Sequence, residues 1–119
     1  SVTVDDITME LAESGKANFC YSTSDNYDDV FHIGLGETLC KTDPKLVYCG
    51  LFEQGEKVRV IVYAGEDISK EKSAGEIVKS ISQILGGAGG GSPKFAQGGG
   101  TDKSKKEDAI KNAKSMIIQ

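Results

Sequence analysis

No apolar run in the 119-residue sequence approaches the roughly 18–20 residues that a membrane-spanning helix requires. The chain also lacks an initiator methionine, and its first residues form neither the basic stretch nor the apolar segment of a secretion signal. We therefore expect a cytoplasmic protein with no membrane partner, and a fragment of a longer chain. Its length, with 38% hydrophobic and 27% charged residues, predicts one globular domain over residues 1–119.

Residues that carry catalysis are scarce. His32 is the only histidine and lies in an apolar run, which favours a partly buried structural role over that of a general base. Asp28 and Asp29 would point apart on a helix, so they cannot pair as an acid/base dyad. The three cysteines are odd in number and lack a C-x-x-C spacing, which indicates reduced core thiols and not a zinc site. They are Cys20, Cys40 and Cys49. We expect no catalytic centre, metal or cofactor in this chain.

Charge is distributed unevenly along the sequence. The whole chain has a net charge of −4, which alone argues against a nucleic-acid partner. Residues 1–68 have a net charge of −8, whereas residues 69–119 have a net charge of +4. Because the local potential decides what a surface attracts, the C-terminal half is suited to face an anion. The alternative is a pair of solvated helices with surplus lysines.

Apolar periodicity predicts two pairs of strands. Residues 7–13 and 18–23 alternate apolar with polar positions, which predicts a hairpin at one edge of a sheet. Residues 46–52 and 58–64 are apolar on both faces and are joined by a glycine-containing turn, which predicts a hairpin in the sheet centre.

Three helices are predicted around these strands. Acidic residues 25–29 suit a helix start, although residues 31–35 would also pass as a strand. Its apolar face would be Val30, Phe31, Leu35 and Leu39.

Ser73 and Glu76 form a capping box before a second helix, which Gly86 ends. Its apolar stripe is Ala74, Ile77, Val78, Ile81, Ile84 and Leu85. A last helix begins near Asp102 or Ser104. Its stripe is Ala109, Ile110, Ala113, Met116 and Ile117. The predicted class is α+β: a mixed, largely antiparallel sheet with helices packed on it, and a glycine-rich loop between the last two helices.

The segment from Gly86 to Gly100 holds eight of the 15 glycines. A flexible linker is one interpretation. However, residues 93–97 place rigid, apolar and amide side chains at its centre, and strongly amphipathic helices flank it. We therefore favour a fitted loop in which glycine allows close approach to another surface. Gly90 and Gly99 are our candidates for positions of close approach or positive φ.

A fitted glycine loop can gather backbone amides around an anion, and the next helix N-terminus adds its dipole. Lysines in and after the loop supply charge. Phe95 stacks on a base or anchors the loop in the core, and the core role is favoured. The spacing matches neither a phosphate-binding loop nor a dinucleotide fingerprint, so a nucleotide-binding fold is not supported.

Residues 73–100 contain Ala-Gly-Glu-Ile-Val-Lys, an apolar helix and Gly-Gly-Ala-Gly-Gly-Gly-Ser-Pro-Lys-Phe-Ala-Gln-Gly-Gly-Gly. This pattern resembles the C-terminal globular domain of alanyl-tRNA synthetases, which belongs to the DHH-associated domain family. Ser92 stands where that family usually has an arginine, which removes a cation able to hold a phosphate bidentately.

The resemblance implies a domain without catalysis that contacts the outer corner of tRNA and supports aminoacylation and editing by other domains. Its implied partners are tRNA, the remaining domains of the parent synthetase and a possible second copy in a homodimer. ATP, magnesium and zinc are implied only for those other domains. The candidate RNA-binding residues are Gly89, Gly90, Gly91, Ser92, Pro93, Lys94, Phe95, Gln97, Gly98, Gly99, Gly100, Lys103, Lys105 and Lys106.

Two alternatives stay open. The same domain family follows the catalytic domain of DHH-type phosphoesterases, where it binds substrate. There the glycine run usually leads into a histidine, whereas this chain has Ser92-Pro93, which favours the synthetase. The other alternative is a protein-interaction or dimerisation module without RNA binding, which the acidic N-terminal half would suit.

Overall fold

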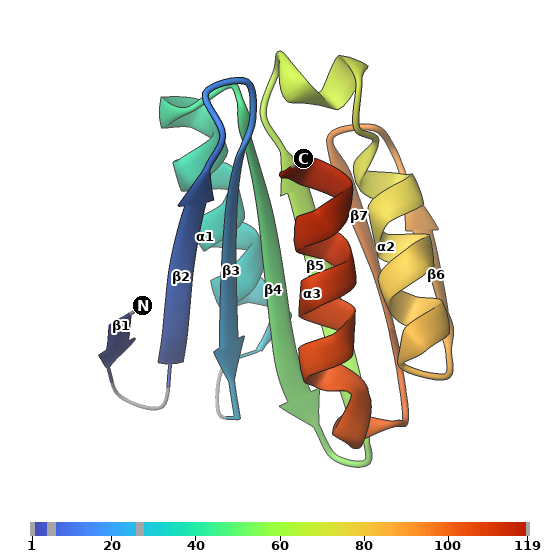
Figure 1. Cartoon of the computed structure of the whole chain (residues 1–119). Coiled ribbons are helices and arrows are strands. Elements are labelled where there is room, and N and C mark those ends of the chain that lie inside the picture. The colour runs from blue at the N-terminus through green and yellow to red at the C-terminus, as the bar shows by residue number, and fades with distance from the viewer. Residues whose placement is uncertain (1, 5–6, 26–27, 119) are drawn as a thin grey trace.

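The computed structural model describes residues 2–4, 7–25 and 28–118. Seven strands form one sheet in the order β1-β2-β3-β4-β5-β7-β6 (Figure 1). The strands are β1 (Val2–Val4), β2 (Ile7–Glu13), β3 (Asn18–Ser24), β4 (Leu46–Gln54), β5 (Lys57–Ala64), β6 (Ala88–Gly91) and β7 (Phe95–Gly100). The helices are α1 (Asp29–Thr42), α2 (Ala74–Ile84) and α3 (Lys106–Ile117), with 3-10 turns η1 (Ile68–Lys70) and η2 (Lys103–Lys105). Among the described strands only β3 and β4 run parallel, which confirms the predicted α+β class.

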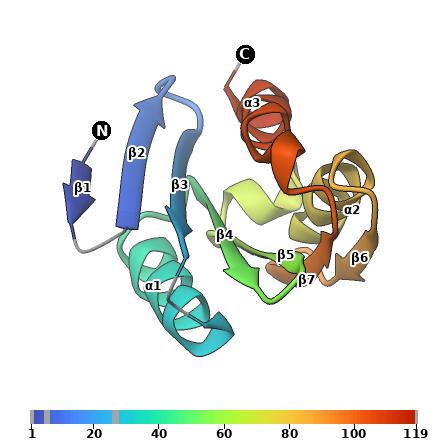
Figure 2. The ribbon, with the colours of Figure 1, turned by 90° about the horizontal axis from the view of Figure 1, so that it is seen from below.

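The helices lie on opposite faces of the sheet, with α2 and α3 on one face and α1 on the other (Figure 2). The larger core lies between the sheet and the pair α2 and α3, and it includes the valines of β5 and the apolar stripes predicted for both helices. A smaller core lies under α1 around Tyr48 and Cys40. As predicted, β4 and β5 pair antiparallel in the sheet centre and are buried on both faces.

Helix α1 forms where the sequence left a strand possible. Asp28 is its N-cap, and its side chain accepts a hydrogen bond from the Phe31 amide. Asn26 and Tyr27, within the predicted helix start, lie outside the described residues. The predicted apolar face is wrong at Val30, which is 71% exposed. The buried positions are instead His32, Gly36 and Cys40.

Gly36 explains why α1 turns this face, and not the face with Val30, toward the sheet. A Cβ at Gly36 would lie 2.7 Å from a ring carbon of Tyr48 and 3.0 Å from one of Tyr63. The glycine that weakens the helix prediction therefore lets the helix approach two aromatic rings of the sheet.

The predicted capping box at α2 is wrong, because the Ser73 side chain makes no capping hydrogen bond. The first amides of α2 donate instead to backbone carbonyls of the glycine-rich segment. Ala74 N donates to Pro93 O at 2.8 Å, and Gly75 N donates to Ser92 O at 3.1 Å. At the other end, Gly86 follows the helix with φ 77°, as predicted for a left-handed cap residue.

The glycine-rich segment is a β-hairpin and not the predicted loop. Strands β6 and β7 pair antiparallel, and β7 also pairs with β5, so the hairpin extends the sheet beyond its centre. After β7, Asp102 accepts a hydrogen bond from the Ser104 amide and begins η2, which leads into α3. The 3-10 turn thus begins where the sequence predicted the last helix, and α3 itself begins at Lys106.

Candidate nucleic-acid interface

Two glycines of the hairpin are required by its packing against α2. A Cβ at Gly89 would lie 2.6 Å from Cγ1 of Val78 on that helix. A Cβ at Gly98 would overlap the hydroxyl of Ser82, which is also on α2. These two positions face the helix, so the helix lies closer to the sheet than any side chain would permit.

Gly99 and Gly90 differ in whether the fold leaves room for a side chain. A Cβ at Gly99 would overlap the carbonyl oxygen of Val58 on the neighbouring strand, so the predicted close approach is confirmed. At Gly90 a Cβ would meet nothing within 4 Å, and the backbone has no positive φ. The prediction of a positive φ at Gly90 is therefore wrong, whereas close approach of a partner to Gly90 stays a prediction.

The hairpin presents an open face on the side away from α2. Because Gly89 faces α2, its neighbour Gly90 points to the opposite side of the sheet. Helix α1 packs against β4 and β5 and does not extend beneath β6 and β7 (Figure 2). Gln97 is exposed, and Phe95 is partly buried with its ring centroid 5.0 Å from that of Tyr63. Strand β6 consists of one alanine and three glycines, so it adds no large side chain to this face.

The β6–β7 turn holds three of the candidate residues, Ser92, Pro93 and Lys94. Ser92 closes the turn, because its hydroxyl donates to Phe95 O and accepts from Phe95 N, each at 3.1 Å. Lys94 follows in the turn and forms an ion pair with Glu66. That pairing lowers the pKa of the Glu66 carboxyl.

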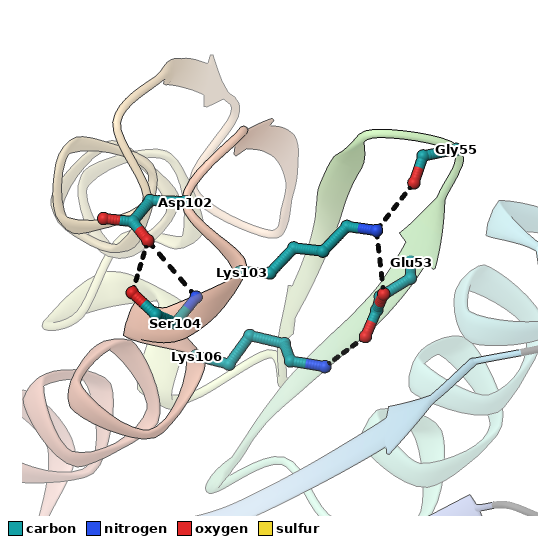
Figure 3. Close-up of polar contacts among 6 residues, drawn as sticks. All are labelled: Glu53, Gly55, Asp102, Lys103, Ser104 and Lys106. Atoms are coloured by element: carbon teal, nitrogen blue, oxygen red, sulfur yellow. Dashed lines mark hydrogen bonds and ion pairs between the residues drawn. The ribbon is translucent and has the colours of Figure 1, made fainter.

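Two further candidate lysines meet at one carboxylate at the other end of β7 (Figure 3). Lys103 Nζ lies 3.0 Å from Oε1 of Glu53 and also donates to Gly55 O at 2.8 Å. Lys106 Nζ lies 2.6 Å from Oε2 of the same glutamate. These hydrogen bonds lower the pKa of Glu53 to about 2. Lys105, the last residue of η2, instead pairs with Asp108 of α3, at 3.7 Å.

The structure thus does not gather the four predicted lysines into one basic patch. Lys94 precedes β7, and the other three follow it. Each of the four has a carboxylate partner. A phosphate that approached any of them would have to compete with that partner.

A cavity of about 260 Å³ lies where β5, the end of β7 and the C-terminal end of α2 meet. Its wall consists of residues 86–88 and 99–101 together with Lys57, Val58 and Arg59. Neither Lys57 nor Arg59 was predicted from the sequence as a site residue. The available signal was Arg59 itself, the chain's only arginine, within a strand that is otherwise almost entirely apolar.

His32 lies in a buried hydrogen-bonded cluster under α1. Its Nδ1 is 2.8 Å from the Tyr48 hydroxyl, and its Nε2 is 3.0 Å from the Ser24 hydroxyl. The ring stacks on Phe52 at a centroid distance of 4.9 Å. Burial lowers the pKa of His32 to about 4, although Asp28 partly opposes this. The structural role predicted for His32 is confirmed, and its side chain is fully buried where partial burial was predicted.

The DHHA1 domain profile matches residues 16–119 of the chain. The chain belongs to the DHHA1 domain family. It is 50% identical over 103 residues to an alanine–tRNA ligase of Nitrosopumilus maritimus, covering 87% of this chain and 11% of that protein. It is 40% identical over 110 residues to an alanine–tRNA ligase of Cenarchaeum symbiosum, covering 92% of this chain and 12% of that protein. The DHHA1 domain thus spans about a tenth of the length of these curated relatives.

Solved structures agree with this assignment at the level of the fold. The C-Ala domain from Aquifex aeolicus alanyl-tRNA synthetase matches with a TM-score of 0.85 and 24% identity, covering 92% of this chain and 99% of that one. A protein described as a DHH domain of the S1P family of ribosomal proteins matches with a TM-score of 0.61 and 13% identity, over 28% of its own chain. The DHHA1 domain described here therefore shares its fold with the C-Ala domain of alanyl-tRNA synthetase.

Two features are absent from the described residues of this DHHA1 domain. Within residues 2–4, 7–25 and 28–118, no helix is long and apolar enough to cross a membrane. The same residues contain no group of three or more histidine, cysteine, aspartate or glutamate side chains placed to hold a metal ion. The three cysteines are free and buried, as the sequence indicated.

Proposed function

We propose that this domain binds tRNA through the open face of its β6–β7 hairpin, at the outer corner of the tRNA. In the parent protein, an alanine–tRNA ligase, it would support aminoacylation and editing by other domains. The relatives named above are alanine–tRNA ligases, and they support this assignment. Catalysis belongs to other parts of that protein, as does the use of ATP.

The observation that carries the proposal is Gly90. Its exposed position on the open face accepts a Cβ without any contact inside the domain, so packing does not account for the glycine. A glycine there lets a partner approach the backbone of β6 closely. A strand without large side chains suits recognition of a rigid shape, which is how folded RNA is often read.

Filter binding of the domain to three RNAs tests the proposal. We expect intact tRNA to bind more tightly than a tRNA without its D loop or a plain duplex of equal length. With about three to five phosphate contacts, the logarithm of the association constant should fall with the logarithm of salt concentration with a slope of about −2 to −4. Equal affinity for the three RNAs would contradict shape recognition. No affinity at low salt would indicate an interaction or dimerisation module instead.

Gly90→Val provides the residue-level test, with Gly34→Val as the matched control. Both glycines are exposed, and a Cβ at either position meets nothing within 4 Å. Both variants should therefore keep the melting temperature of the native domain. Only Gly90→Val should weaken tRNA binding, by about tenfold, or about 1.4 kcal/mol. Equal affinity of the two variants would exclude close contact at Gly90.

A further inference from the structure

We propose that the cavity beside β5 is a phosphate-binding subsite in which Arg59 and Lys57 hold one phosphodiester of the bound RNA. This inference rests on the proposed function and adds the residues that provide the main electrostatic contact. Neither cation is among the residues that the glycine motif indicates. Arg59 and Lys57 are identified as candidates by the charges and contacts of the folded domain.

The two cations of the cavity are free, whereas the lysines predicted for RNA binding are not. Arg59 and Lys57 make no ion pair and no side-chain hydrogen bond with the described residues. By contrast, a phosphate at Lys103 or Lys106 would have to displace the carboxylate of Glu53. A phosphate at Arg59 would displace only water, so more of its attraction is available for binding.

The wall of the cavity suits a small anion. Glycines 86, 87, 99 and 100 contribute backbone without side chains, so an oxygen can approach closely. Among the described residues, no carboxylate lines the cavity. The C-terminal end of α2, where carbonyl oxygens would repel an anion, is nearby. However, backbone amides already donate hydrogen bonds to carbonyl oxygens at this end. Ser82 O accepts from Gly87 N at 2.8 Å, and Leu85 O accepts from Asp102 N at 2.9 Å.

The size of the cavity limits its occupant. Its volume of about 260 Å³ lies below the roughly 300–1,000 Å³ of pockets that enclose a whole small-molecule ligand. A phosphate with part of its ribose is therefore a better fit than a complete nucleotide. Arg59 is partly buried and is paired in register with Gly99, which has no side chain. Its planar guanidinium can donate two parallel hydrogen bonds to a phosphate.

Binding of tRNA at several salt concentrations tests this subsite. Arg59→Gln should weaken binding about tenfold and reduce the magnitude of the salt slope by about one. Arg59→Lys should keep the slope but recover only part of the affinity, because lysine cannot donate in the bidentate geometry. Lys111→Gln is the matched control, since Lys111 is exposed on α3 without an ion pair to the described residues. If Arg59→Gln and Lys111→Gln behave alike, the subsite is refuted.

Titration with inorganic phosphate separates the subsite from the proposed function. In two-dimensional NMR spectra, phosphate should shift the amide signals of Gly87, Gly99 and Thr101 in the native domain but not in Arg59→Gln. If these shifts appear while tRNA does not bind, the phosphate subsite stands and tRNA recognition fails. If tRNA binds but Arg59→Gln changes neither measurement, the proposed function stands and the subsite fails. Removing the terminal phosphate of the tRNA should leave the Arg59 effect intact, and its loss would overturn the assignment to an internal phosphodiester.

Discussion

Acidification from pH 7.5 to 5 should destabilise the domain through His32. The ring is fully buried, and its pKa in the folded domain is about 4, against 6.5 for the unfolded chain. Between these values the unfolded chain binds the proton and the folded domain does not, so stability falls as the pH falls below 6.5. Each unit of difference between the two pKa values corresponds to 1.36 kcal/mol, so the free energy of unfolding falls by about 3 kcal/mol in total. At pH 5 the free energy of unfolding is already about 2 kcal/mol lower than at pH 7.5.

Urea unfolding followed by circular dichroism at pH 5, 6, 7 and 7.5 measures this effect. Glu53 also has a lowered pKa, but at about 2. Its contribution is lost only as the pH falls below about 4.5, outside the range measured. The variant His32→Gln keeps hydrogen-bonding capacity for Tyr48 and Ser24 without a titrating ring. Its stability should depend much less on pH over the same range. A native domain with constant stability from pH 7.5 to 5, or a variant with the same loss, would refute the reasoning.

Two further predictions concern the hairpin and its lysines. Glu53→Gln should release Lys103 and Lys106 and steepen the salt dependence of RNA binding, whereas Glu56→Gln, which removes the same charge from the same turn, should change affinity without steepening it. Equal salt slopes for the two variants would show that Glu53 does not restrain the lysines. Gly98→Val should destabilise the fold by more than about 2 kcal/mol, because its side chain would overlap Ser82 of α2. Gly34→Val should be nearly neutral in the same urea unfolding experiment, and similar losses for the two variants would contradict the packing argument.

The sequence predicted the central hairpin and the two amphipathic helices because each has a local signal. Residues 46–64 are continuously apolar around a glycine turn, and α2 and α3 carry apolar residues at helical spacing. The glycine-rich segment has no such signal, since glycine has low strand propensity and no side chain to show periodicity. It forms strands because β5 offers an open edge and α2 requires a surface without side chains.

The candidate site was predicted in part. The residues of the hairpin were identified as a unit, but the charges around it were not. Glu53 and Glu66 pair with lysines that are 28 to 53 residues away in the sequence, so the neutralisation of those lysines depends on tertiary structure. Arg59 reaches the glycine cavity only because β5 pairs with β7. A count of charges along the chain cannot distinguish a free cation from a paired one.

The glycines of this DHHA1 domain therefore serve two different purposes, and mutation can separate them. Gly89 and Gly98 lie against α2, where a side chain would disrupt the core. Gly90 lies on the opposite side of the sheet, where a side chain would disrupt nothing within the domain. A substitution that weakens RNA binding at the first two positions would reflect loss of the fold. The same loss at Gly90, with the melting temperature unchanged, would locate the contact surface on the open face.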